Sequence, residues 1–81
     1  MRIDKFLKVS RIIKRRTVAN DACDASHISV NGRVVKASYD VKQGDIVVIT
    51  FGEKRLKIKV LDVKDVVRKN DASELYEVLP E

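Results

Sequence analysis

The sequence contains little of what disulfides and metal sites require. Its 81 residues include one cysteine, one histidine and no tryptophan. One cysteine excludes an internal disulfide, and one cysteine with one histidine excludes a structural zinc site. Such cysteine usage suits a reducing compartment, so we expect a cytoplasmic protein.

Long apolar runs and aromatic side chains are also scarce. The longest apolar run is Ile46–Ile49, which is far too short to cross a membrane, and no signal peptide is visible. The only aromatic residues are Phe6, Tyr39, Phe51 and Tyr76. Once the core has taken its share of these rings, too few remain for a surface that binds nucleic acid by base stacking.

The residue types of catalysis occur singly rather than in constellations. Cys23 lies in a stripe of small apolar residues, which indicates a buried structural side chain. The carboxylates lack the spacing of a metal-binding loop, and Gly32, Gly44 and Gly52 are isolated turn glycines rather than a phosphate loop. We therefore expect a protein that is not an enzyme and that has no metal site and no cofactor.

The length allows one small domain. Hydrophobic residues make up 44% of the chain, which is enough for a compact core, and no linker or repeat divides it. We expect a single domain over residues 1–81.

Positive charge is concentrated at one end of the chain. The net charge is +5; residues 1–16 hold seven cations and one anion, whereas residues 65–81 hold two cations and five anions. This asymmetry favours a polyanionic partner over a merely solvated surface, and a membrane is disfavoured because no bulky apolar face accompanies the cations. The candidate binding residues are Arg2, Lys5, Lys8, Arg11, Lys14, Arg15 and Arg16.

Two amphipathic helices are predicted near the N-terminus. The first spans about residues 2–10, with an apolar face and a cationic remainder. The second spans about residues 15–25, with a stripe of small side chains that comprises Val18, Ala19, Ala22, Cys23 and Ala25. The residues predicted to face away from this stripe are Thr17, Asn20, Asp21 and Asp24. Arg15 and Arg16 begin this helix, where a bound phosphate would offset their conflict with the helix dipole.

Strand patterns follow the helices. Asn31-Gly32 between two short apolar runs predicts a hairpin, since both residues tolerate positive φ. Residues 46–51 and the alternating residues 55–60 predict two further antiparallel strands. A helical turn over residues 72–75, capped by Asn70 or Asp71, and a last edge strand up to Pro80 complete the pattern. The predicted fold class is α+β, with two N-terminal helices packed on a small twisted antiparallel sheet.

Four short motifs together resemble the S4 domain, an RNA-binding module first defined in a small-subunit ribosomal protein. In chain order they are Arg2-Ile3-Asp4-Lys5-Phe6-Leu7, Arg16-x-x-Ala19, Ile28-x-Val30-Asn31-Gly32 and Val41-x-x-Gly44-Asp45. The resemblance implies an S4-type (alpha-L) fold with its core motif over about residues 2–51, and a β extension and acidic tail over about residues 52–81. The family usually has glycine where this chain has Ser26, so a less tight cap is expected at the end of the second helix.

The chain is also similar to small stand-alone S4 proteins of bacterial ribosome-associated quality control, through Lys8-Val9-Ser10-Arg11 and Lys14-Arg15-Arg16-Thr17. These are relatives of the small ribosome-associated heat-shock S4 protein. The resemblance implies a monomer that binds stalled large ribosomal subunits obstructed by peptidyl-tRNA and contacts large-subunit rRNA and the P-site peptidyl-tRNA. It also implies support for alanine tailing by RqcH, a further candidate partner. The RNA-contacting arginines of the family correspond to Arg2 and Arg16.

Two other functions fit the same residues. One is a general rRNA-binding factor of ribosome assembly or heat shock, which would associate with immature particles rather than with blocked subunits. The other is a protein adaptor whose basic end meets an acidic protein, and a salt-titrated RNA-binding assay separates it from the RNA-binding functions.

Overall fold

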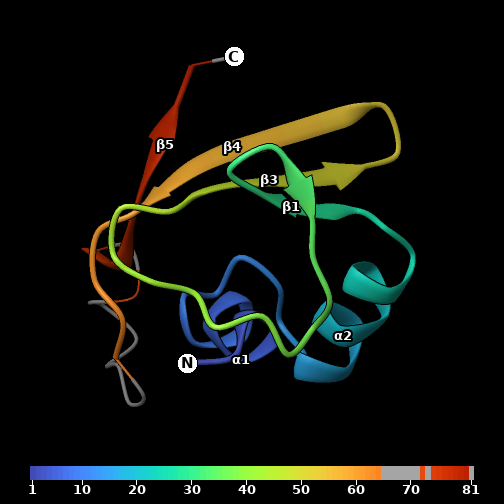
Figure 1. Ribbon diagram of the computed structural model, residues 1–81, viewed down its shortest axis with the longest axis horizontal. Helices are drawn as coiled ribbons and strands as arrows, with labels where there is room; N and C mark the ends of the chain where they lie inside the picture. Colours follow the sequence, from blue (N-terminus) through green and yellow to red (C-terminus); the bar gives the residue numbers. More distant parts are fainter. Residues whose placement is uncertain (65–71, 73, 81) are drawn as a thin grey trace.

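Two helices and five strands follow one another in the described part of the chain (Figure 1). The computed structural model describes residues 1–64, 72 and 74–80. The elements are α1 (Ile3–Val9), α2 (Arg16–Asp24), β1 (Ile28–Val30), β2 (Arg33–Val34), β3 (Ile46–Phe51), β4 (Lys54–Val60) and β5 (Tyr76–Leu79). Each helix is one residue shorter at either end than predicted, and the predicted α+β class is confirmed.

The strands form one antiparallel sheet in the order β2-β1-β3-β4-β5. The register of β3 and β4 pairs Val47 with Ile58 and Val48 with Lys57. Because successive side chains of a strand point to opposite faces, the buried Ile58 and the neighbouring Lys57 and Lys59 lie on different faces of the sheet. This alternation was expected of residues 55–60 and is confirmed.

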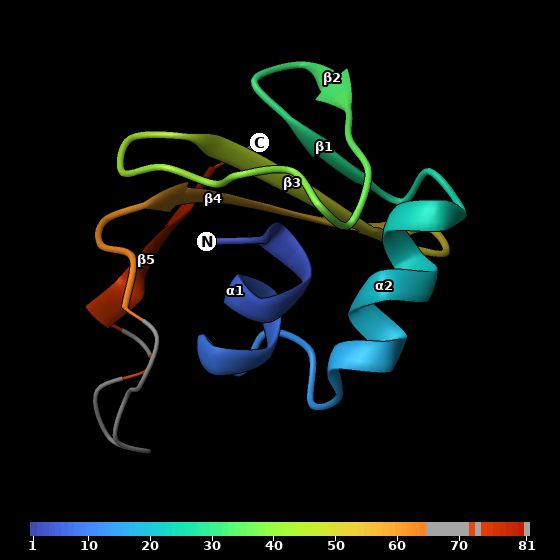
Figure 2. The ribbon, with the colours of Figure 1, turned by 60° about the horizontal axis from the view of Figure 1, so that its bottom comes forward.

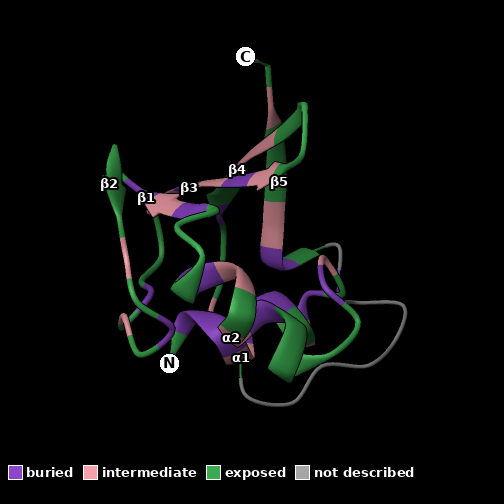
Figure 3. Cartoon of the chain, turned by 90° about the vertical axis from the view of Figure 1, so that its right-hand side faces the viewer, coloured by how far each residue is buried: buried purple, intermediate pink, exposed green. Residues whose placement is uncertain are grey.

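Both helices lie on the same side of the sheet, as Figure 2 shows. Buried residues occur on both helices and on the strands that they face (Figure 3), and no helix of the described residues covers the far face of the sheet. The core includes Ile3, Phe6, Leu7, Ala19, Cys23, Ile28, Val30, Val41, Val47, Ile49, Ile58 and Val60. Apolar positions at helical spacing in α1 and at every second position in the strands therefore meet in one interior.

The backbone ahead of α1 is anchored to a loop. The amide of Ile3 donates a hydrogen bond to the carbonyl of Tyr39 at 2.8 Å, and Arg2 forms an antiparallel bridge with Asp40. No local sequence pattern predicts this pairing between residues far apart in the chain. It fixes the position of Arg2 relative to α1.

The predicted hairpin turn is present and is tied to a second turn. Asn31 and Gly32 have φ values of 52° and 85°, as a two-residue hairpin turn with positive φ at both positions requires. The Asn31 side chain accepts a hydrogen bond from the amide of Ile46 at 3.0 Å and donates one to Asp45 at 3.2 Å. The Tyr39 hydroxyl also donates to Asp45, at 3.1 Å. This network explains why the Asn31-Gly32 and Gly44-Asp45 motifs occur together.

The packing face of α2 is narrower than predicted. Ala19 and Cys23 are buried and Ala22 is half-buried, but Val18 is 50% exposed and Ala25 is also exposed. Each residue of an α-helix advances roughly 100° around the axis, so a position next to Ala19 in sequence already points away from α1. The prediction that Val18 and Ala25 belong to the packing stripe was therefore wrong.

The end of α2 is closed without a glycine. The amide of His27 donates to the carbonyl of Ala22 at 2.9 Å, and the amide of Ser26 donates to Cys23 at 3.1 Å. These are the two hydrogen bonds of a Schellman motif. Ser26 adopts a φ of 65°, so a residue with a Cβ occupies the left-handed position that glycine usually fills. The expectation of a less tight cap was wrong, because both bonds form and the penalty falls on the Ser26 backbone.

The chain after β4 closes the sheet. Ala72, Glu74 and Leu75 lie in a short helical turn, with Ala72 and Leu75 buried. The edge strand β5 then pairs with β4, as predicted. The predicted capping residues Asn70 and Asp71 lie outside the described residues. Within the described part of the chain, neither helix has the length and apolar character needed to cross a membrane.

Candidate nucleic-acid interface

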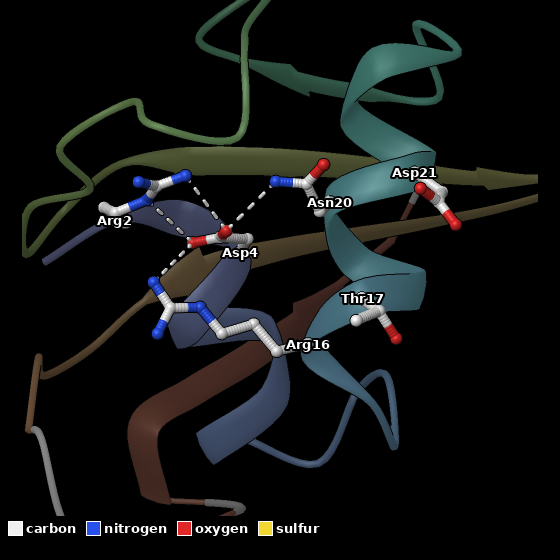
Figure 4. A pocket seen from close by; sticks show the side chains of 6 residues that line it. All are labelled: Arg2, Asp4, Arg16, Thr17, Asn20 and Asp21. Atoms are coloured by element: carbon white, nitrogen blue, oxygen red, sulfur yellow. Dashed lines mark hydrogen bonds and ion pairs between the residues drawn. The ribbon is translucent and has the colours of Figure 1, made fainter.

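A buried carboxylate at the start of α1 organises the predicted arginines. The side chain of Asp4 is only 3% exposed and accepts hydrogen bonds from both helices (Figure 4). Arg2 donates to it through Nε and Nη2, each at 3.3 Å, and Arg16 donates through Nη2 at 3.5 Å. The Asn20 amide donates at 3.4 Å and the backbone amide of Lys5 at 2.8 Å. Two helices thus place two guanidinium groups beside one carboxylate.

The two guanidinium groups remain accessible while they are held. The side chains of Arg2 and Arg16 are 49% and 46% exposed. A guanidinium group has five N–H donors, and Asp4 engages two of those of Arg2 and one of those of Arg16. The remaining donors are available to a phosphate, which arginine binds in a planar, two-pronged geometry.

Asp4 is ionised in this environment. Its burial by itself would raise the pKa, but the hydrogen bonds from Asn20 and the Lys5 amide, together with the Arg16 charge, outweigh burial and hold the pKa of Asp4 below its usual value. Since a carboxylate with its usual pKa is already ionised at neutral pH, the ion pairs with Arg2 and Arg16 are intact there.

These residues border a shallow hollow of about 340 Å³ between the start of α1 and the exposed side of α2. Its lining comprises Arg2, Asp4, Arg16, Thr17, Asn20 and Asp21. The lining joins two half-exposed cations to hydroxyl, amide and carboxylate groups. Such a site suits a ligand that carries both an anionic group and hydrogen-bond donors.

The structure does not bring the other predicted cations to Asp4. Lys8 lies exposed on α1, and Lys5 is half-buried on the same helix. Arg11, Lys14 and Arg15 are exposed in the connection between the helices, where Arg11 has a φ of 62°. None of these five residues lines the hollow.

The start of α2 has no side-chain cap. Arg15 occupies the N-cap position without a capping hydrogen bond, and no acidic residue lies in the first turn. The positive end of the helix dipole thus lies close to Arg15 and Arg16. This confirms the expected conflict of charges, which an anion would relieve.

The remaining chemically reactive candidates are structural. Cys23 is buried, and burial, followed by the charges of Asp4 and Asp24, raises the pKa of its thiol to about 11, which disfavours the reactive thiolate. Among the described residues no group of three or more histidine, cysteine or acidic side chains could hold a metal ion.

The role of Asp4 was not predicted from the sequence, where it stood only as one anion within a basic segment. Asn20 was predicted to face away from the helix interface, and this was wrong, because Asn20 is half-buried and points toward Asp4 (Figure 4). A signal was available, because Asp4 precedes Leu7 by three residues and so lies beside the apolar face of α1. An acidic residue on a buried helix face indicates a paired carboxylate.

Comparison with known proteins identifies the family. The model of the S4 domain family matches residues 1–47, and the chain belongs to the S4-domain family. Within it, the chain is 56% identical over 81 residues to the RQC P-site tRNA stabilizing factor of Halalkalibacterium halodurans, with all of this chain and 92% of that protein covered. The proteins of the same name from Streptococcus pneumoniae and Bacillus subtilis are 54% and 49% identical over the whole chain, which covers 92% and 94% of their lengths. These matches confirm the resemblance to the small stand-alone S4 proteins of ribosome-associated quality control.

Solved structures share the fold. The trimeric structure of Vibrio cholerae Heat Shock Protein 15 has a TM-score of 0.90 and 26% identity, and the match covers 98% of this chain and 81% of that one. The solution structure of the hypothetical protein HP1423 has a TM-score of 0.84 and 30% identity, with 100% and 99% covered. The predicted S4-type fold is thereby confirmed.

Proposed function

We propose that this protein is a non-catalytic RNA-binding factor of ribosome-associated quality control. The observation that carries the proposal is the pair of half-exposed guanidinium groups of Arg2 and Arg16, which Asp4 holds side by side. A-form RNA is read through its shape, phosphates and 2′-hydroxyls, which such a pair can do without aromatic rings. The full set of proposed RNA-binding residues is Arg2, Lys5, Lys8, Arg11, Lys14, Arg15 and Arg16.

The relatives support a specific RNA target. Their name refers to the P-site tRNA in ribosome quality control, and three of them are 49–56% identical to this chain over its whole length. We infer the same target here: the protein binds large ribosomal subunits obstructed by peptidyl-tRNA and contacts both large-subunit rRNA and the P-site tRNA. The paired Arg2 and Arg16 beside Asp4, together with the exposed Arg11, Lys14 and Arg15 of the connection between the helices, supply the positive charge for binding phosphate backbones.

Support of alanine tailing follows from this binding. A factor that holds the tRNA of an obstructed subunit in one position makes its nascent chain accessible to repeated addition by RqcH. The proposed contribution is one of positioning, so the protein supplies no reacting group.

Crosslinking with RNA sequencing, in cells with stalled translation, tests the target. We expect crosslinks to tRNA and to the large-subunit rRNA around the P site, and their loss in the double variant Arg2→Ala/Arg16→Ala. The matched control is Lys57→Ala/Lys59→Ala, which removes the same amount of charge from the opposite face of the sheet. Crosslinks to unrelated RNAs, or crosslinks that persist in the arginine double variant, would contradict the proposal.

A second function is favoured by the TM-score of 0.90 to Vibrio cholerae Heat Shock Protein 15. That likeness fits a general rRNA-binding factor of heat shock or ribosome assembly. Sedimentation separates the two functions, since a quality-control factor peaks with subunits that carry peptidyl-tRNA, whereas an assembly factor peaks with immature particles. A protein adaptor, the remaining alternative, would bind RNA weakly or not at all.

A further inference from the structure

The hollow beside Asp4 has two chemically unlike sides. On one side Arg2 and Arg16 offer N–H donors, and on the other side Thr17 and Asp21 offer a hydroxyl and a carboxylate (Figure 4). Thr17 and Asp21 are one helical turn apart on α2, and both are exposed. Within the described part of the chain, neither side chain has a hydrogen-bond or ion-pair partner.

A carboxylate beside a bound phosphate weakens binding by charge repulsion, unless the carboxylate accepts a hydrogen bond from a donor of the ligand. An ionised carboxylate only accepts hydrogen bonds, and Asp21 lacks a cation of its own because both arginines are turned to Asp4. A polyanion bound on Arg2 and Arg16 would therefore be repelled by Asp21 if its neighbouring groups were only acceptors. A nucleotide that contacts Asp21 is therefore bound more favourably if it presents a hydroxyl or an amino group at this place.

Ribose provides such a hydroxyl close to the phosphate. The 2′-hydroxyl is both donor and acceptor, and it is the group that distinguishes RNA from DNA. The Asp21 carboxylate can accept its proton, and the Thr17 hydroxyl can donate to its oxygen. The hollow of about 340 Å³ lies at the lower end of the range for small-ligand sites, which fits one sugar and its phosphate rather than a whole helix.

We propose that the Thr17 and Asp21 side of the hollow binds the ribose 2′-hydroxyl of a nucleotide whose phosphate lies on Arg2 and Arg16, so that this site selects RNA over DNA. The inference rests on the proposed RNA-binding function. In this proposal Thr17 and Asp21 recognise RNA although neither carries a positive charge. Asp21 then binds the ribose in addition to repelling phosphate.

The test compares one stem-loop of fixed sequence in three chemical forms. The forms are RNA, RNA with 2′-fluoro substitution, and DNA; the 2′-fluoro form keeps the A-form preference but lacks the donor. We expect the wild-type protein to bind RNA about three- to tenfold more tightly than 2′-fluoro RNA, the range that one or two net hydrogen bonds provide. Asp21→Ala should reduce this ratio to about one, and Thr17→Val should reduce it partly. Asp21→Asn, whose amide oxygen still accepts, should retain most of it.

The matched control is Asp24→Ala, which removes an exposed carboxylate from the same helix but not from the hollow. It should tighten binding to all three forms equally and leave their ratio unchanged. If Asp21→Ala behaves in the same way, Asp21 acts only by charge and the inference is overturned. An equal affinity of the wild-type protein for RNA and 2′-fluoro RNA would also overturn it. Failure of the wild-type protein to bind any of the three forms would instead contradict the proposed function.

Discussion

At the scale of single residues, Asp4 has a larger effect on the geometry of the site than any one of the cations. Arg2 directly precedes α1 and Arg16 begins α2, and their like charges would keep them apart without the carboxylate between them. The cost of burying Asp4 is offset by three side-chain partners and one backbone amide. The position of the paired arginines therefore depends on a residue that is itself almost inaccessible.

Asp4→Asn should lower stability in a manner that depends on pH. Asparagine keeps the volume but removes the charge, and at pH 7 we expect a loss of about 1–2 kcal/mol, discounted because both arginines are half-exposed. The folded-state pKa of Asp4 is lowered, so the stability that its charge provides is present above the unfolded pKa of about 3.9 and is lost as the pH falls through the folded value. Urea unfolding of both proteins from pH 7 to pH 2.5 measures this difference. A difference that stays constant over the whole range would show that the Asp4 charge contributes nothing.

Ser26→Gly should stabilise the protein. Ser26 has a φ of 65°, where glycine is free of the Cβ penalty of about 1–2 kcal/mol but adds unfolded-state entropy of about 0.4–1 kcal/mol. The net gain of about 0.5–1 kcal/mol corresponds to a rise in Tm of roughly 2–8 °C, measured by circular dichroism. The control is Ser38→Gly, at an exposed position without positive φ, which should lower Tm. A decrease in Tm for both variants would mean that the cap of α2 carries no strain.

At the scale of elements, the hairpin between β1 and β2 depends on its turn. Gly32→Val places a β-branched residue at a φ of 85°, although a Cβ there would meet no atom within 4 Å. The penalty therefore comes from the backbone alone and should be about 1–3 kcal/mol. Thermal unfolding should show a lower Tm, with RNA affinity retained by the folded fraction. Arg33→Val, one residue later in β2, is the control and should leave Tm nearly unchanged; an equal effect of the two variants would place the strain elsewhere.

The elements could be predicted because their signals are local. The apolar spacing of α1, the Asn31-Gly32 turn and the alternation of β4 each lie within a few residues, and all three are confirmed. The S4 motifs made the fold predictable as well as the single elements, because they indicate the order of the elements over the first half of the chain. The pairing of Arg2 with Asp40 and the meeting of Arg2 with Arg16 are non-local, and no periodicity carries them.

The site was therefore predictable in part. Charge counting identified the seven cations of the N-terminal segment, and the resemblance to the S4 family singled out Arg2 and Arg16, which the structure places beside Asp4. The same counting treated Asp4, Thr17, Asn20 and Asp21 as unremarkable, since charge and polarity alone do not tell which side chains will border the same hollow. Which side chains border the hollow depends on how far each is buried and on where its helix lies relative to the other helix. Both depend on tertiary packing.

At the scale of the whole molecule, affinity for RNA should depend strongly on salt. The cations expected to contact phosphates are Arg2, Lys5, Arg11, Arg15 and Arg16. About five such contacts, at roughly 0.7 to 0.9 released counterions each, give a slope of log K against log salt of about −3.5 to −4.5. Filter binding or fluorescence anisotropy with an rRNA fragment between about 50 and 300 mM KCl measures it. A slope near zero would contradict polyanion binding altogether.

Two pairs of cations, on different faces of the molecule, could bind RNA. Arg2 and Arg16 lie in the helical layer, whereas Lys57 and Lys59 lie on the face of β4 opposite to the buried Ile58. The two pairs carry the same charge, so the long-range field changes equally when either pair is removed, and only direct contacts distinguish them.

We expect Arg2→Ala and Arg16→Ala each to release the protein from obstructed large subunits, because each removes charge-assisted phosphate contacts worth about 1.5–3 kcal/mol, or roughly ten- to more than a hundredfold in affinity. Lys57→Ala with Lys59→Ala should weaken association only slightly, since the half-buried Lys57 and the exposed Lys59 lie on the sheet face opposite to the helices and contribute mainly through the long-range field. Both sets should remain folded because neither removes core side chains, although the arginine variants lose some stability because each removes a partner of the buried Asp4 carboxylate. Sucrose-gradient sedimentation measures the association, and circular dichroism of each variant establishes that it is folded. If the strand lysines release the protein and the helix arginines do not, RNA lies on the open face of the sheet, and the roles proposed for Arg2 and Arg16 are wrong.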